Sequence, residues 1–161
     1  MAEHVSEKPG APAKKNRRKI WLLFIGIGSL LLAAALFYNA VSVQIGIQIE
    51  RIVDASYARY GQYDSQFSGI ISEDLFRRVN NRDHGNKHET YTENVVETYK
   101  RTSPQIWHNF LTATALYQYS YEYRGYLNGE EGFCGAHDIP VWVHLALQNG
   151  SWVVTNVYEE P

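Results

Sequence analysis

The sequence predicts an α+β protein that is anchored in a membrane by a helix near its N-terminus. Three observations predict this class. Residues 20–49 contain no charged side chain and follow a basic segment. Apolar side chains between residues 45 and 63 recur at helical steps of three and four, whereas residues 113–124 alternate with the period of a β-strand. The 161 residues allow one domain of ordinary size, or a smaller domain with appendages.

The composition excludes several classes of protein. Apolar residues make up 45% of the chain and charged residues 20%, which excludes wholesale disorder. A single cysteine excludes a disulfide-stapled fold and a cysteine-based zinc finger. Residues 1–19 carry six Lys or Arg against two acidic residues, and residues 20–161 carry nine against fifteen. A body this acidic argues against a nucleic-acid-binding protein.

The densest apolar run, from Ile20 to Tyr38, has the length of a membrane-spanning helix. Its 19 residues are close to the roughly 20 that cross the hydrocarbon core. Eleven of them are Ile, Leu or Phe, which favour insertion by roughly 3–7 kcal/mol in total. The residues assigned to the span are Ile20, Trp21, Leu22, Leu23, Phe24, Ile25, Leu30, Leu31, Leu32, Leu36, Phe37 and Tyr38. Trp21 and Tyr38 lie near its two ends, where amphipathic rings prefer the interface.

The charges around the apolar run predict its orientation. Five of the six residues at 14–19 are basic, and no basic excess follows the run. The positive-inside rule therefore predicts a cytoplasmic basic tail at 1–19, a transmembrane helix at 20–41 and an extracytoplasmic α+β domain at 42–161. A cleaved signal peptide is the competing interpretation, because Ala33-Ala34-Ala35 offers a cleavage site. Continued apolar character beyond Ala35 favours an uncleaved anchor.

The exported part is expected to begin with a helix that packs on the rest of the domain. Its apolar stripe consists of Ile45, Ile49, Ile52, Ser56, Tyr60 and Tyr63, widened by Val53 and Tyr57. A coiled-coil partner helix is the alternative, but three clean heptads are missing.

Two further helices are predicted before the strands begin. Residues 72–79 form the first, with Ser72 as its cap, acidic residues in its first turn and basic residues in its last. Residues 80–88 form a polar loop. The pattern Thr90-x-x-Glu93 is typical of a capping box and predicts a third helix that ends before Pro104.

The C-terminal half is predicted to form a sheet. Residues 113–124 alternate strictly apart from Leu116, residues 105–112 are expected to be an extended lead-in, and residues 128–136 a glycine-containing loop. The strands at 139–148 and 151–158 flank Asn149-Gly150, which is typical of a two-residue type I′ hairpin turn. A two-residue loop fixes the expected register. The expected pairs on one face are Leu147 with Trp152, Leu145 with Val154 and Val141 with Tyr158. Those on the other are Trp142 with Val157, His144 with Thr155 and Ala146 with Val153. Both faces are partly apolar, so a helix, a partner or a ligand should cover the second.

This order of elements resembles an NTF2-like (cystatin-like cone) domain. The likeness covers about residues 45–160 and is carried by the closing hairpin. Its matching residues are Val141, Val143, Leu145, Asn149, Gly150, Trp152 and Val154. The resemblance implies a cone of about three helices packed on a curved antiparallel sheet. A basic tail, one span and such a domain are also similar to the bitopic scaffold subunits of type IV secretion systems, which implies a role in protein assembly.

Two groups of side chains are candidates for a ligand or partner surface. The first is a row of tyrosines, Tyr117, Tyr119, Tyr121 and Tyr123, for which core packing is favoured over partner contact. The second is Trp142 with His144, which the expected register places on one face and which suit the lining of a pocket. His137-Asp138 near His144 suggests proton transfer, but a turn pair and a hydrogen-bonded sheet histidine are favoured.

No catalytic residue, metal site or cofactor is predicted. His84 and His88 are four residues apart but lie in a stretch with no apolar face, which favours a solvated loop. Cys134 is alone, and burial is favoured over a disulfide between two chains. The sequence has no phosphate-binding glycine loop, no His-Glu-x-x-His and no Gly-x-Ser-x-Gly.

The sequence therefore predicts a membrane-anchored protein-interaction or assembly module without its own catalysis. The expected partners are the lipid bilayer and other membrane or envelope proteins, including further copies of this chain, and no nucleic acid. The alternative is a small-ligand-binding or hydrolytic cone that uses His144 and nearby aromatic residues.

Overall fold

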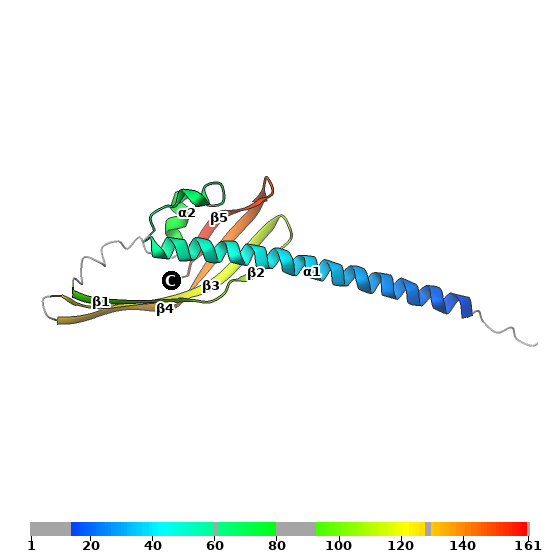
Figure 1. Ribbon diagram of the computed structural model, residues 1–161, viewed down its shortest axis with the longest axis horizontal. Coiled ribbons are helices and arrows are strands. Elements are labelled where there is room, and N and C mark those ends of the chain that lie inside the picture. The colour runs from blue at the N-terminus through cyan, green and yellow to red at the C-terminus, as the bar shows by residue number, and fades with distance from the viewer. Residues whose placement is uncertain (1–13, 60, 80–92, 128–129, 161) are drawn as a thin grey trace, which may run out of the picture. The chain divides into compact units, whose positions relative to one another are not determined.

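A computed structural model describes residues 14–59, 61–79, 93–127 and 130–160 and has an α+β fold (Figure 1). The helical elements are α1 (Lys14–Ala58), a 3₁₀ turn η1 (Ser65–Phe67) and α2 (Glu73–Arg78). The strands are β1 (Glu93–Arg101), β2 (Gln105–His108), β3 (Thr112–Leu127), β4 (Glu130–Gln148) and β5 (Ser151–Glu159). The predicted class is confirmed, and the cone architecture stays a prediction.

The chain divides into two compact units, Met1–Asn39 and Ala40–Pro161. α1 runs through the boundary. From Lys19 onward this helix is long and apolar enough to cross a membrane, with a mean hydropathy of 2.5 in its most apolar window. In the first unit the described apolar side chains from Ile20 onward are exposed, as expected of a segment that contacts lipid.

In the second unit, the C-terminal part of α1 packs on one face of the sheet. Ile45, Ile49 and Ile52 are buried there at the predicted helical spacing, together with Val53 and Ser56, which confirms the stripe in this part. The prediction that the helix extends to Tyr63 is wrong. α1 ends at Ala58, and the chain turns at Gly61 with φ 74°, a conformation that glycine adopts without steric cost.

α2 forms where its caps and charges predict. The hydroxyl of Ser72 accepts a hydrogen bond from the backbone N–H of Leu75, and Glu73 and Asp74 lie in the first turn. Arg77 and Arg78 occupy the last turn, where positive charge suits the helix dipole. The short helix buries Phe76, whose carbonyl accepts a hydrogen bond from the Ser56 hydroxyl at 2.7 Å. This bond ties α2 to α1.

The sheet is antiparallel, with the order β1-β3-β4-β5 and with β2 also paired to β3. β1 pairs with residues 119–126 of β3, and β2 pairs with residues 113–116. β1 and β2 therefore form one edge that is interrupted around Pro104, a residue that cannot donate to a ladder. β3 and β4 are long and bend along their length (Figure 1).

Two predicted elements are wrong. The third helix is instead β1, which contains Val95, Val96, Thr98 and Tyr99, residue types that favour strands. The segment at 128–136, for which a loop is predicted, forms part of β4 from Glu130 onward. The polar loop at 80–88 and the capping box at Thr90 lie outside the described residues, apart from Glu93.

The closing hairpin forms at Asn149 and Gly150, which have φ values of 50° and 82° as a type I′ turn requires. Three predicted pairs next to this turn are confirmed: Leu147 with Trp152, Ala146 with Val153 and Leu145 with Val154. Beyond them the register shifts by one residue between His144 and Leu145.

The remaining predicted pairs of the hairpin are therefore wrong. His144 faces Asn156, Trp142 faces Tyr158 and Val141 faces Glu159. The physical reason is a β-bulge at Thr155, which inserts one extra residue into β5. The Thr155 hydroxyl donates a hydrogen bond to the His144 carbonyl at 3.2 Å.

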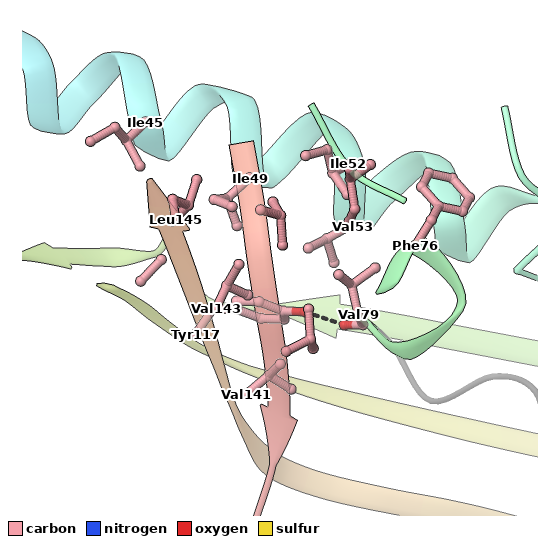
Figure 2. Packing of buried hydrophobic residues seen from close by; sticks show 14 of the residues in the cluster. Ile45, Ile49, Ile52, Val53, Phe76, Val79, Tyr117, Val141, Val143 and Leu145 are labelled. Atoms are coloured by element: carbon pink, nitrogen blue, oxygen red, sulfur yellow. Dashed lines mark hydrogen bonds between the residues drawn. The ribbon is translucent and has the colours of Figure 1, made fainter. Parts of the chain in front are cut away.

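The core lies between the sheet and the two helices. Figure 2 shows Ile45, Ile49 and Ile52 of α1 directed toward Val143 and Leu145 of β4. The buried residues that form this cluster on the sheet are Ala113, Ala115, Tyr117, Tyr119, Val141, Val143, Leu145, Trp152, Val154 and Val157. They define the inner face of the sheet.

Candidate functional site

The tyrosine row of β3 lies on the inner face of the sheet. Tyr117 is fully buried, and its hydroxyl donates a hydrogen bond to the Val79 carbonyl (Figure 2). Burial raises the pKa of this hydroxyl well above its usual value. The Tyr119 hydroxyl lies 3.2 Å from a carboxylate oxygen of Glu159, and the Tyr123 hydroxyl lies 3.3 Å from Glu97. These side chains act as core residues with their polar ends satisfied, as the favoured interpretation expects.

Ring contacts continue this packing within the row and with tyrosines of α1 and β1. Tyr57 of α1 stacks on Tyr99 of β1 with ring centroids 3.7 Å apart. Tyr119 and Tyr121 stack at 6.2 Å, and Tyr121 contacts Tyr123 edge to face at 5.7 Å. Offset and edge-to-face pairs of this kind add to the energy of burial. Tyr99 also lies 6.4 Å from Tyr119, ring centre to ring centre, so these contacts connect α1 through β1 to the tyrosine row of β3.

Trp142 and His144 lie on the opposite face of the sheet from the tyrosines. Trp142 pairs with Leu116 and His144 with Thr114, whereas the neighbouring Tyr117 points into the core. Successive side chains of a strand point to opposite faces, so these two groups do not line one cavity. The structure thus keeps the two predicted candidate groups apart.

His144 is exposed and contacts a hydroxyl group. Its Nδ1 lies 3.2 Å from the Thr114 hydroxyl. In the part of the chain that the structure describes, no ion pair joins this histidine to a carboxylate. His137 lies elsewhere on β4, 3.5 Å from Glu122, and Asp138 accepts a hydrogen bond from Ser120. The proton-transfer pair suggested by the sequence is therefore not assembled among the described side chains.

The exposed face of the sheet carries an aromatic cluster that sequence reasoning finds only in part. Trp107 of β2 stacks on Trp142 with ring centroids 6.2 Å apart and planes inclined by 26°. The bulge in β5 places Tyr158 opposite Trp142, and Leu116 pairs with Trp142 from β3. Trp107 is 47% exposed and Tyr158 50%.

We call this surface the outer aromatic face and define it by the residues that the pairing places there. They are Gln105, Trp107, Thr114, Leu116, Gln118, Trp142, His144, Ala146, Val153, Asn156 and Tyr158. None of them is Asp, Glu, Lys or Arg. At the rim, Glu160 accepts a hydrogen bond from the indole N–H of Trp142 at 3.0 Å, which fixes the ring. An uncharged exposed face rich in aromatic residues is typical of a contact surface.

One sequence signal could have located this face. Leu116 is the apolar exception at a polar position of an otherwise strict alternation, and it lies at the centre of the cluster. Sequence reasoning misses Trp107 because residues 105–112 also fit helical spacing. It assigns Tyr158 to the other face because the bulge at Thr155 has no recognisable sequence signature.

A second feature is a hollow of about 270 Å³ in the part of the sheet where β1 pairs with β3. It is lined by Thr98, Lys100, Ser120, Tyr121, Glu122 and His137. The side chains are polar, and Glu122 pairs with His137 and, at 3.8 Å, with Arg124. The pair of Glu122 with Arg124 is partly exposed and therefore contributes little to stability.

The described residues do not form a metal-binding cluster. No group of three His, Cys, Asp or Glu side chains able to hold a metal occurs within them. His84 and His88 lie outside the described residues, and the structure does not describe the side chain of Cys134, whose backbone pairs with Tyr123 in the sheet.

Comparison with known proteins gives no further guidance, because no family model, curated protein or solved structure matches this chain.

Proposed function

We propose that this chain is a single-pass membrane protein whose extracytoplasmic domain is a non-enzymatic assembly module and self-associates through the outer aromatic face. The observation that carries the proposal is the stacked pair Trp107 and Trp142 on the sheet, in which Trp107 is exposed and Trp142 is half-buried. Aromatic residues dominate the energetic centres of protein interfaces.

Membrane anchoring is supported by the length and apolar character of α1. The basic residues at 14–19 directly precede the apolar run, so the positive-inside rule favours a cytoplasmic N-terminus and an exported C-terminal unit. The resemblance to NTF2-like scaffold subunits of type IV secretion systems agrees with an assembly role, as an analogy of fold and organisation.

A second copy of the chain is the partner that the charges favour. The second unit is acidic overall, so two copies repel each other wherever their charged surfaces meet. The outer aromatic face has no Asp, Glu, Lys or Arg side chain, and Glu160 lies only at its rim, so this repulsion is weak there. Membrane anchoring gives all copies the same orientation, which suits a two-fold axis along the membrane normal and a self-complementary contact.

The test is the oligomeric state of the full chain in lipid nanodiscs or a mild detergent. The wild-type chain is expected to form dimers that chemical cross-linking also captures in the membrane. Trp107→Ser and Trp142→Ser each remove a central ring and are expected to weaken the dimer by about 2 kcal/mol, about 30-fold in Kd.

The matched control is Phe133→Ser, which removes an exposed aromatic ring from the far part of β4 and leaves the outer aromatic face intact. This variant is expected to dimerise like the wild type. Circular dichroism of each variant checks that the fold is retained. A wild-type monomer in the membrane, or equal dimerisation of all variants, would overturn the proposal.

A further inference from the structure

The turn between β2 and β3 presents two apolar side chains, Phe110 and Leu111, where turns usually carry polar residues. Leu111 is 69% exposed and Phe110 41%. An exposed apolar pair costs free energy in water unless something covers it. The position of the pair on a turn tip singles it out from the scattered exposed apolar residues that any protein has.

The turn is held in one conformation. The side-chain oxygen of Asn109 accepts hydrogen bonds from the backbone N–H groups of Leu111 at 3.0 Å and Thr112 at 2.8 Å, and from the Thr112 hydroxyl at 3.2 Å. Phe110 has φ 69°, a region that a bulky residue rarely occupies. A strained residue persists only where its surroundings fix it, so the structure presents these two side chains in a defined direction.

The turn lies at the end of the second unit where the chain enters from the apolar segment. The ring of His108 is 3.1 Å from the Ser42 hydroxyl, and Ser42 follows the first residue of this unit, Ala40, by two positions. The backbone N–H of Leu147 donates to the Leu111 carbonyl at 2.8 Å, which brings the β4–β5 hairpin to the same end.

Along the described elements that lead away from this end, the first charged side chain is several residues distant. Along α1 the first charge after the apolar run is Glu50, which is about 12 Å along the helix axis from Ser42 at 1.5 Å per residue. Residues 102–121 and 139–158 are likewise free of Asp, Glu, Lys and Arg. This charge-free length along the helix exceeds the roughly 5–10 Å by which interfacial segments enter a bilayer, so the end of the unit can enter without burying the charge of Glu50.

We infer that Phe110 and Leu111 insert into the interfacial region of the bilayer that holds the span, together with the neighbouring Leu147. We assign lipid as the material that covers these side chains for two reasons. The chain joins the apolar segment at this end of the unit, and the described residues around Ser42 carry no charge. This second attachment fixes the tilt of the domain on the membrane. The inference rests on the proposed membrane anchoring and is independent of self-association.

The test uses the full chain in phospholipid vesicles, with Cys134→Ser and a nitroxide label at Leu111→Cys. Collision rates with oxygen, which partitions into lipid, and with a water-soluble nickel chelate report the surroundings of the label. Lipid insertion predicts that oxygen collides more often than nickel at position 111. The matched control is Asp74→Cys on α2, where the side chain is 82% exposed and nickel is expected to collide more often.

Each other outcome overturns the inference. Frequent nickel collisions at position 111 would place the turn in water, and protection from both reagents would place it against protein. Leu147→Cys provides an independent second label on the neighbouring hairpin if labelling at Leu111 disturbs the turn. Self-association is measured separately with the tryptophan variants, so either proposal can fail while the other holds.

Discussion

Arg101 is the residue that ties the sheet to the helix by charge. Its guanidinium binds Asp54 with two hydrogen bonds, at 2.6 and 2.8 Å, and lies 3.1 Å from Glu50. Both acidic residues belong to α1, and Arg101 closes β1. The hydrogen bonds to Asp54 raise the pKa of Arg101, so the side chain stays charged at every accessible pH. A bidentate arginine–carboxylate pair of this kind is stronger than a single hydrogen bond.

Loss of this clamp is expected to destabilise the domain measurably. Arg101→Gln should lower the free energy of unfolding by about 1–3 kcal/mol, because two carboxylates lose hydrogen bonds to a charged partner. Urea denaturation in detergent, followed by tryptophan fluorescence, measures the change. Arg77→Gln is the control, because Arg77 pairs with Glu73 on α2 and both side chains are about half exposed. Its loss should cost less than about 1 kcal/mol. Equal effects of the two substitutions would contradict the special role of Arg101.

Glu97 makes the stability of the domain depend on pH. Burial raises the pKa of its carboxyl above the ordinary value of 4.5, and the hydrogen bond from Tyr123 offsets part of this rise. The folded chain therefore binds the proton more tightly than the unfolded chain. The contribution of Glu97 to stability is fully present below pH 4.5 and is lost as the pH rises through the raised value.

Glu97→Gln is expected to remove this loss, because the amide keeps an acceptor for the Tyr123 hydroxyl and carries no charge. The variant should gain stability relative to the wild type as the pH is raised from about 4 to 7. Denaturant titrations of both proteins across this range measure the difference. A difference that stays constant, or that grows toward low pH, would show that the carboxyl has no raised pKa in the folded chain.

At the level of elements, the sequence correctly predicts those features that depend only on neighbouring residues. The cap at Ser72 and the Asn149-Gly150 turn each depend on a few adjacent residues, and both form as predicted. The buried stripe beginning at Ile45 also follows from spacing alone. In each of these elements the neighbouring residues favour a single conformation.

The errors occur where distant pairing determines the outcome. The segment at 93–101 carries a helical cap signal and β-favouring residues together, and its pairing with β3 resolves the conflict in favour of a strand. Gly132 and Gly135 suggest a loop. Instead, this segment pairs with β3, because the backbone groups of the long β3 need hydrogen-bond partners, and it forms part of β4. The bulge at Thr155 shifts one strand by a residue and changes which side chains meet.

Gly135 illustrates why a glycine occupies a strand here. A Cβ atom at this position would lie 2.6 Å from the backbone carbonyl oxygen of Tyr121 and 3.3 Å from the Cα of Glu122. The adjacent register shift between Tyr119 and Tyr121 brings the two strands this close. The glycine is therefore required by the close approach of two backbones.

Gly135→Ala is expected to force β3 and β4 apart at the bulge. The expected loss of stability is about 1–3 kcal/mol, as in other overpacked sites. Urea denaturation measures it, and hydrogen exchange should show faster opening of the amides around Tyr121. Gly69→Ala serves as a contrast, because a Cβ atom at Gly69 would meet no other atom within 4 Å, whereas its φ is 84°. Its cost should come from backbone strain without faster exchange near Tyr121.

At the scale of the whole molecule, the two apolar faces of the sheet have different roles. The inner face is covered by α1 and α2, which explains one half of the apolar pattern in β3 to β5. No described helix of the second unit covers the outer aromatic face. The sequence predicts that both faces need a cover, but only the pairing of Trp142 with Leu116 and Tyr158 shows which side chains lie on the second face.

The proposed assembly role requires that the second unit lies outside the cytoplasm. Basic residues cluster at 14–19, and moving them across the bilayer is unfavourable, so the N-terminal tail is expected to stay inside. In cells that express the full chain with Cys134→Ser, Asp74→Cys should react with a membrane-impermeant maleimide before lysis. Ala11→Cys in the basic tail should react only after lysis. The reverse pattern would invert the topology and overturn the extracytoplasmic assembly role, whereas the insertion of Leu111 depends only on membrane anchoring and is tested separately in vesicles.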